Sequence, residues 1–169
     1  VAHRTKSDRP FLRVSTHPAN STSVAGIRHV MEMWAKDGWV PDICVIDYTD
    51  ILAPMPRTGK MDDRDQINQT WVELRRLSQE LHCLVVTATQ ADTDGYSRWL
   101  LDKKNFNGDR RKNDHVTAMI GINQTPEEKE RGQVRWNFID RREAQFSPKQ
   151  CCFISQCLAI GQPVVCSSF

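Results

Sequence analysis

The pattern of apolar and polar residues in the first half of the chain predicts strands that are separated by helices. A short apolar stretch at 11–15 is a strand candidate, and a turn-rich segment follows it. Residues 43–46 form a continuous apolar run between Pro41 and Asp47, and residues 83–90 begin with a second such run. Runs of this kind are typical of strands that are buried on both faces. We therefore expect two fully buried strands at these places.

Two segments have apolar residues at helical spacing. A Ser or Thr at 21–23 can cap the first helix, and Gly38 ends it. The second predicted helix covers residues 64–82 and carries its charged residues away from its apolar stripe. The stripes consist of Val24, Ile27, Val30, Met31 and Trp34 in the first helix and Ile67, Trp71, Leu74, Leu77 and Leu81 in the second.

The second half of the chain predicts one long loop followed by short strands. Residues 91–114 have many charges and no sustained apolar period, so we expect a loop with a helical turn near 99–101. Strands are expected at 116–122, 133–139 and 151–160, with a charged connection at 124–132. The order strand, helix, strand, helix, strand predicts an α/β fold with a mainly parallel sheet and helices on its faces. The last strands are expected as antiparallel additions at the C-terminal edge.

Composition and length fit a single soluble domain. The 169 residues suffice for one substantial core, and 39% hydrophobic and 26% charged residues are ordinary for a globular protein. No apolar run approaches the ~18 residues of a membrane helix, and the N-terminus has no apolar signal core. We therefore expect a cytoplasmic protein without a membrane partner.

Six cysteines bear on the cellular compartment. Cys44 and Cys83 lie inside the apolar runs, where reduced cysteines act as small core residues. The C-terminal cysteines lack the paired C-x-x-C spacing of a zinc ribbon. Neither zinc nor disulfide bonds are expected, in agreement with a reducing compartment.

The net charge of +2 is too small to indicate a nucleic-acid partner, but the distribution of charge is informative. The loop at 91–114 combines basic residues with Tyr96, Trp99 and Phe106. Single-stranded nucleic acids bind such segments because bases stack on aromatic rings while cations follow the phosphates. The alternative is a solvated charged loop whose aromatic residues cover the edge of the core. The candidate cations are Arg98, Lys103, Lys104, Arg110, Arg111 and Lys112, with Arg57 and Lys60 in a second loop.

Polar groups follow the predicted strands of the parallel sheet, namely Asp47, Gln90 and the Asn123–Gln124 pair. Because the carboxyl ends of parallel strands share one edge, these groups can converge on one ligand. In P-loop ATPases a carboxylate at this position helps to hold the magnesium that bridges the nucleotide phosphates. A core strand that simply ends in a solvated Asp explains the segment around Asp47 equally well.

The order of the motifs VIDYTDIL, LVVTATQ, HVTAMIGINQT and VRWNFIDRREAQF resembles the C-terminal two-thirds of a RecA-like ATPase domain. The resemblance is closest to DnaB-type replicative hexameric helicases, particularly those of phages and prophages, and it covers nearly the whole chain. It implies a three-layer RecA-like fold, ATP and Mg²⁺ as cofactors, and single-stranded DNA as a partner. It also implies that the full-length parent self-associates into a ring, a hexamer in this family.

The resemblance further implies roles for individual residues. Asp47 would be the Walker-B aspartate, which coordinates Mg²⁺ through an ordered water. Gln90 would be the sensor glutamine, which contacts the γ-phosphate and relays the nucleotide state to the adjoining DNA loop. Arg142 aligns with the arginine finger that such subunits offer to the neighbour's nucleotide. A planar guanidinium suits that place because it matches phosphate and neutralises charge on the γ-oxygens.

Two departures from the family pattern limit this resemblance. The family's finger is Lys-x-Arg, and Asp140 stands at the lysine position, so either Arg141 or Arg142 can be the arginine that reaches the phosphate. The motif G-x-x-x-x-G-K-[ST] is absent from the 169 residues. The phosphate-binding loop is therefore expected upstream of Val1. Residues 1–169 are expected to be one partial RecA-like domain that does not hydrolyse ATP alone.

Other functions remain open. A degenerate ATPase remnant would bind DNA or partner helicase subunits without turnover, and the missing phosphate-binding loop favours it. A metal-dependent nuclease would use Asp47 and Asp50 as a two-carboxylate site and would need no nucleotide. Within the ATPase class, RecA-like recombinases and circadian-type ATPases share the fold and the sensor positions.

Overall fold

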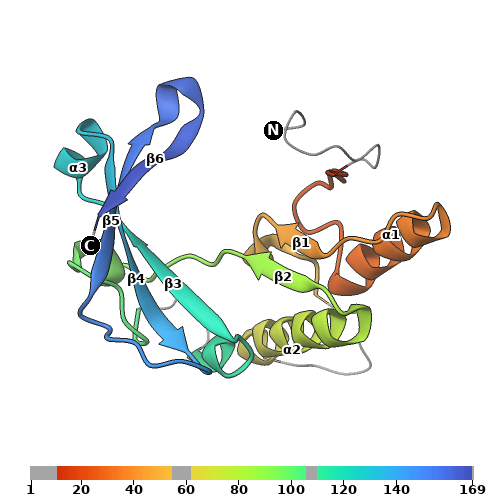
Figure 1. Ribbon diagram of the computed structural model, residues 1–169. Helices are drawn as coiled ribbons and strands as arrows, with labels where there is room; N and C mark the ends of the chain where they lie inside the picture. The colour runs from red at the N-terminus through yellow and green to blue at the C-terminus, as the bar shows by residue number, and fades with distance from the viewer. Residues whose placement is uncertain (1–10, 55–61, 106–109, 169) are drawn as a thin grey trace.

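The computed structural model describes residues 11–54, 62–105 and 110–168. Within these ranges the chain forms a two-stranded parallel sheet flanked by helices and a four-stranded antiparallel sheet (Figure 1). The predictions that lie outside the described residues concern Arg57, Lys60, Phe106 and the side chain of Arg110.

The two predicted strands of the first half form the parallel sheet. β1 (Ile43–Ile46) pairs with β2 (Leu84–Thr87), with Cys44 opposite Val85. Parallel strands need a long crossover, and α2 (Asp63–Leu81) lies in the connection between them. The predicted order of strand, helix and strand is therefore confirmed for this part of the chain.

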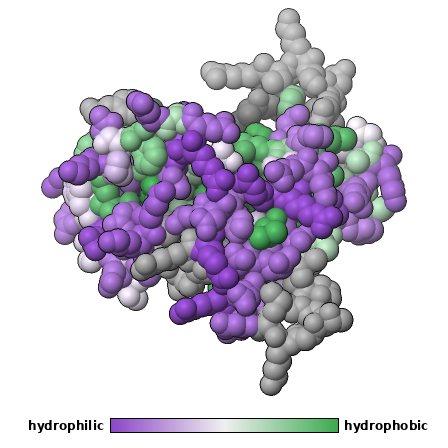
Figure 2. All heavy atoms as spheres, turned by 90° about the horizontal axis from the view of Figure 1, so that it is seen from below, coloured by the Kyte–Doolittle hydropathy of each residue, from purple (hydrophilic) through white to green (hydrophobic). Residues whose placement is uncertain are grey.

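Both predicted helices are present. α1 (Val24–Lys36) follows Ser23, whose side chain accepts a hydrogen bond from the backbone N–H of Gly26. α2 ends at His82, which has a left-handed backbone with φ of 48°. The face of the molecule on the α2 side is mostly hydrophilic, as expected for an amphipathic surface helix (Figure 2). Within the described ranges, no helix is long and apolar enough to cross a membrane.

The two helices pack on one face of the parallel sheet. Leu77 of α2 is completely buried, and burial of such a side chain contributes about 1.5–3 kcal/mol. Cys83 belongs to the same core and Cys44 packs against it, which confirms the expectation for these two cysteines. The buried cluster consists of Val24, Met31, Leu74, Leu77 and Cys83, with Cys44, Ile46 and Val85 of the sheet packed against it.

The other face of the parallel sheet is exposed, so the prediction that both faces are buried was wrong. Successive side chains of a strand point to opposite faces, and α1 and α2 lie only on the face of Cys44 and Val85. In the described part of the chain, no helix covers the second face, so the three layers implied by a RecA-like fold are not all present there. The residues of this second face are Ile43, Val45, Leu84 and Val86, which are 55%, 72%, 58% and 43% exposed.

Residues 11–15 do not form the predicted strand. They have no regular secondary structure, and Phe11 and Leu12 are 56% and 77% exposed. An apolar run becomes a strand only where a neighbouring strand accepts its backbone hydrogen bonds, and no strand of the described residues pairs with this segment. The segment instead lines a cavity of about 380 Å³ together with α1 and β1.

The strands of the second half form the antiparallel sheet, in the order β3 (Ala118–Asn123), β4 (Gln133–Arg141), β5 (Cys151–Cys157) and β6 (Gln162–Ser168). β3 pairs antiparallel with β4 and not with β2, so the prediction of antiparallel late strands is confirmed, whereas their predicted place at the edge of the parallel sheet was wrong because they form a sheet of their own. Along β3, Ile120 and Ile122 are exposed, whereas Gly121 and Asn123 are buried. One covered and one exposed face is typical of antiparallel sheets.

The connections contain structure that the apolar pattern did not indicate. The charged segment after β3 forms α3 (Pro126–Glu130), because Thr125 and Glu128 bind each other's backbone N–H in a capping box. The loop after β2 contains single 3₁₀ turns at Gly95–Ser97 (η3) and Arg110–Asp114 (η4), and the predicted turn near 99–101 is absent.

Candidate functional site

Asp47 and Gln90 lie at the carboxyl end of the parallel sheet. Asp47 directly follows β1, Gln90 comes three residues after β2, and both side chains are exposed. The amide nitrogen of Gln90 lies 3.5 Å from the hydroxyl of Tyr48, which follows Asp47. The prediction that Asp47 and Gln90 share one edge of the sheet is therefore confirmed. This edge presents a carboxylate and an amide to solvent.

The carboxylate of Asp50 is the centre of a network that sequence reasoning missed. One oxygen accepts hydrogen bonds from the Thr89 hydroxyl at 2.8 Å and from the backbone N–H of Gln90 at 3.2 Å. The other oxygen lies 3.0 Å from the ammonium of Lys112, which also donates to the Thr89 hydroxyl at 2.8 Å. Asp50 thus joins the end of β2 to η4.

Lys112 is 1% exposed, so its ammonium cannot reach a nucleic-acid phosphate and its prediction as a DNA contact was wrong. The ion pair with Asp50 keeps the charge inside the protein, beside the ring of Trp71 at 5.9 Å. Nothing in the sequence distinguishes Lys112 from its neighbours Arg110 and Arg111, because burial depends on how η4 packs against α2.

The occupied carboxylate of Asp50 also weighs against the nuclease hypothesis. That hypothesis needs Asp47 and Asp50 to hold a metal together, but Asp50 is bound to Lys112, Thr89 and the backbone of Gln90. In the described ranges no three His, Cys, Asp or Glu side chains come together as a metal site. A metal at Asp47 would therefore need ligands other than a cluster of described His, Cys, Asp or Glu side chains.

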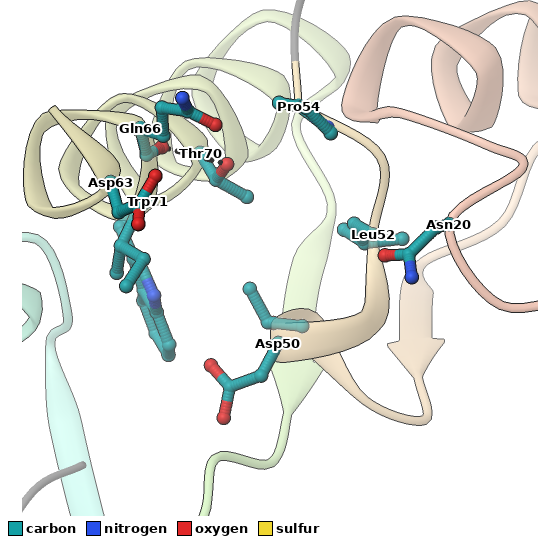
Figure 3. A pocket seen from close by; sticks show the side chains of 10 residues that line it. Asn20, Asp50, Leu52, Pro54, Asp63, Gln66, Thr70 and Trp71 are labelled. Atoms are coloured by element: carbon teal, nitrogen blue, oxygen red, sulfur yellow. Dashed lines mark hydrogen bonds between the residues drawn. The ribbon is translucent and has the colours of Figure 1, made fainter. Parts of the chain in front are cut away.

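A small cavity of about 230 Å³ lies between α2 and η2 (Thr49–Ile51). Figure 3 shows Asp50 on one side of it and Gln66, Thr70 and Trp71 of α2 on the other. The indole N–H of Trp71 is buried and has no hydrogen-bond partner among the described residues. This cavity is smaller than the roughly 300–1,000 Å³ of usual ligand pockets, and Asp47 is not among the residues that line it.

Three buried polar side chains of β3 and β4 hold the backbone of the loop after β2. Asn123 accepts a hydrogen bond from the N–H of Leu101 at 2.8 Å, and Asn137 donates to the carbonyl of Leu101 at 3.0 Å. Arg135 donates to the carbonyl of Trp99. The exposed fractions of Asn123, Arg135 and Asn137 are only 5%, 1% and 3%.

This arrangement corrects the prediction that Asn123 and Gln124 converge with Asp47 and Gln90. Asn123 lies inside the antiparallel sheet, and Gln124 donates to the carbonyl of Gln133 at 2.7 Å. The i, i+2 spacing of Arg135 and Asn137 put both on one face of a strand, which was a usable signal. Polar residues on one face of a strand are normally exposed to solvent. Their spacing therefore did not indicate that these side chains bind the backbone of the loop after β2.

The predicted cations of the loop fall into different environments. Lys103 forms an ion pair of 2.8 Å with Asp140, and Arg111 forms one of 3.0 Å with Asp65. Arg98 and Lys104 are exposed, and neither side chain forms an ion pair with another described residue. Of the described candidates, Arg98 and Lys104 are therefore the cations most available to a phosphate.

Arg141 and Arg142 lie at the end of β4, and both are exposed. Arg142 donates a hydrogen bond to the carbonyl of Asp114, and Arg141 lies 5.2 Å from the ring centre of Phe138. The hydrogen bond from Lys103 is the largest cause that lowers the pKa of Asp140, which keeps this neighbouring carboxyl ionised. Arg141 and Arg142 thus present their guanidinium groups to solvent, next to Asp140, whose carboxylate is paired with Lys103.

No family model and no curated protein matches the sequence. The fold, in contrast, is similar to solved structures. An ATPase domain of known structure matches with a TM-score of 0.67 and 15% identity, over 80% of this chain and 48% of that one. A DnaB-like replicative helicase, described with its interactions with primase, matches with a TM-score of 0.66 and 14% identity, over 80% of this chain and 34% of that one.

The chain has the fold of a DnaB-type helicase ATPase domain. The resemblance drawn from the sequence motifs is thereby confirmed at the level of the fold. The match to the DnaB-type fold holds although the parallel and antiparallel strands form two separate sheets here. The chain spans about half of the first matched structure and about a third of the second.

Proposed function

We propose that this chain is the C-terminal part of an ATP-dependent replicative DNA helicase motor. In the parent protein, Mg-ATP would be bound between the subunits of a ring, and its hydrolysis would drive movement along single-stranded DNA. The observation that supports this proposal most is the pair of exposed side chains Asp47 and Gln90 at the carboxyl ends of adjacent parallel strands, in a chain with a DnaB-type fold.

The donor set at this edge fits magnesium that is shared with phosphate. Mg²⁺ is usually bound by one or two carboxylates together with waters and substrate phosphates, and Asp47 offers one exposed carboxylate. Asp47 would hold the ion through an ordered water, and the ion would neutralise charge that develops on the phosphates. The Gln90 amide, close to the Tyr48 hydroxyl, would contact the γ-phosphate.

Arg142 is proposed as the finger that reaches the nucleotide of the neighbouring subunit. It lies at the end of β4, in the antiparallel sheet, whereas Asp47 and Gln90 belong to the parallel sheet. Its bond to the carbonyl of Asp114 orients the side chain and leaves it exposed. Arg141 has the same exposure and is the alternative finger.

A second candidate function is a remnant that binds DNA or partner helicase subunits without turnover. The absence of G-x-x-x-x-G-K-[ST] from the 169 residues favours it. For the same reason we propose that the chain alone does not hydrolyse ATP. The remnant and the motor differ in one property, which is ATP hydrolysis by the protein that the whole reading frame encodes.

The test is single-stranded-DNA-stimulated ATP hydrolysis by that whole protein, compared with its Asp47→Asn variant. The proposal expects loss of magnesium-dependent hydrolysis, because the amide no longer attracts the cation. Asp42→Asn is the matched control, since Asp42 is exposed at the opposite end of β1. Hydrolysis that is unaffected by Asp47→Asn would reject the proposed site. DNA binding without any hydrolysis would identify the remnant.

A further inference from the structure

Trp99 is an unusually exposed tryptophan, and a buried arginine lies against one side of its ring. The side chain is 60% exposed, while the central guanidinium carbon of Arg135 lies 3.4 Å from the ring centre. Tryptophan side chains are highly buried on average. A tryptophan ring that is largely exposed and yet contacts a buried arginine therefore needs an explanation. We infer that Trp99 is a fixed platform on which an unpaired base of single-stranded nucleic acid stacks. This inference rests on the proposed binding of single-stranded DNA.

The arginine behind the ring is held rigidly. Arg135 is 1% exposed, and its Nε and Nη2 atoms lie 2.7 Å and 3.0 Å from the two carboxylate oxygens of Glu128. Glu128 is fixed in turn, because it also accepts a hydrogen bond from the backbone N–H of Thr125 at 2.8 Å. The guanidinium plane therefore has a defined orientation, and stacking on it gives the indole one as well.

The backbone that carries Trp99 is also fixed. Arg135 donates to the carbonyl of Trp99, and the N–H and carbonyl of Leu101 are bound by buried amides of the antiparallel sheet. Binding to a side chain that is already held in place costs less free energy than binding to a mobile loop, because the loop would have to be ordered on binding. These contacts make Trp99 a preorganised surface and not a loose side chain.

The neighbours of Trp99 indicate the class of ligand. Tyr96 is 77% exposed, and Arg98 is exposed without an ion pair to another described residue. In the sequence, Arg98 stands between the exposed aromatic residues Tyr96 and Trp99. Such a combination suits a single strand, since rings take bases and a cation takes phosphate. The face of the ring that Arg135 occupies is blocked, so one base stacks on the free face. Duplex DNA would not satisfy this site, because its bases are already stacked.

The inference is tested on the full chain with a fluorescein-labelled oligothymidine strand and an abasic strand of the same length. Trp99→Ala should weaken binding of oligothymidine roughly 5- to 150-fold, the range for loss of one stacked base. Binding of the abasic strand should stay unchanged, since that strand keeps its phosphates and offers no base. Trp99→Tyr should retain most of the affinity, and Phe11→Ala is the control for loss of a similarly exposed aromatic residue.

Fluorescence gives a second readout that does not depend on affinity. Oligothymidine should quench the tryptophan emission of the wild-type chain, and Trp99→Tyr should lose that quenching while it still binds. Equal weakening of both strands by Trp99→Ala, or no weakening, would overturn the platform and leave the proposed DNA binding intact. Failure of the wild-type chain to bind any single strand would reject the platform together with the DNA partner. Circular dichroism of each variant shows that the fold is retained.

Discussion

At the scale of single residues, Lys112 is a charged side chain from a charged loop that has become part of the core. Its ammonium binds Asp50 and Thr89 and lies beside the ring of Trp71. When one member of a buried ion pair is removed, the other charge stays buried without compensation, which usually costs about 3–5 kcal/mol. The stability of this part of the protein therefore depends on both residues of the pair.

We expect Asp50→Asn to lower the free energy of unfolding by about 3 kcal/mol, because Lys112 then remains buried beside a neutral amide. Asp42→Asn, an exposed change at the start of β1, should alter stability by no more than about 0.5 kcal/mol. Urea denaturation followed by circular dichroism measures both variants. Equal losses in the two variants would show that the buried pair does not stabilise the fold.

The cysteines should differ in their reactivity. Burial raises the pKa of the Cys83 thiol, which is 4% exposed, whereas Cys166 is exposed. Since the thiolate is the reactive form, iodoacetamide should modify Cys166 first and Cys83 last in the native protein. Peptide mass spectrometry over a time course gives the order. Rapid native modification of Cys83 would contradict its place in a closed core.

At the scale of elements, the sequence predicted what depends on nearby residues and missed what depends on distant ones. The stripes of α1 and α2 and the runs of β1 and β2 are local patterns, so these elements were found. An apolar run does not reveal how many of its faces are covered, so the exposed side of Val45 was unexpected. The shared sheet edge of Asp47 and Gln90 could be predicted, because each residue follows a strand of the parallel pair. The contact of Asp50 with Lys112 of η4 could not be predicted, because it depends on how distant segments pack.

The ion pair between Glu128 of α3 and Arg135 of β4 should make the stability of the fold sensitive to acid. Burial alone raises the pKa of Glu128, but hydrogen bonds from Arg135 and from the backbone of Thr125 outweigh it and lower this pKa below its usual value. A depressed carboxyl pKa stabilises the fold above the unfolded-state value of about 4.3, and this stabilisation disappears as the pH falls through the lower folded value.

Glu128→Gln should therefore be less stable than the wild type at about pH 7, and the difference should shrink as the pH falls below about 4. Urea midpoints at several pH values measure this difference. Glu130→Gln on the same helix is the control, since Glu130 is exposed. A wild-type advantage that is the same at all pH values would mean that Glu128 acts through its shape and not through its charge.

At the scale of the whole molecule, the groups proposed to act on one nucleotide belong to different sheets. Asp47 and Gln90 lie at the edge of the parallel sheet, and Arg142 lies at the end of β4 in the antiparallel sheet. In a ring, one subunit can offer the parallel-sheet edge while its neighbour offers the arginine. Each complete site would then need two copies of the protein.

Mixing two inactive variants of the whole protein tests this arrangement. Asp47→Asn subunits retain the arginine, and Arg142→Ala subunits retain the carboxylate, so a mixed ring contains some interfaces with both groups. We expect the mixture to recover part of the ATP hydrolysis that each variant lacks. If Arg141→Ala and not Arg142→Ala behaves in this way, Arg141 is the finger. Recovery with neither arginine variant would contradict a site shared between subunits.

The ion pair of Asp50 and Lys112 has a consequence for how this protein changes during evolution. The two positions are 62 residues apart in the chain, yet loss of the Asp50 carboxylate leaves the buried Lys112 ammonium without its counter-charge. Sequence drift should therefore rarely replace Asp50 while Lys112 is kept. Related chains should keep both residues or replace both, and a pair of apolar residues of similar volume is the exchange that the surrounding core tolerates best.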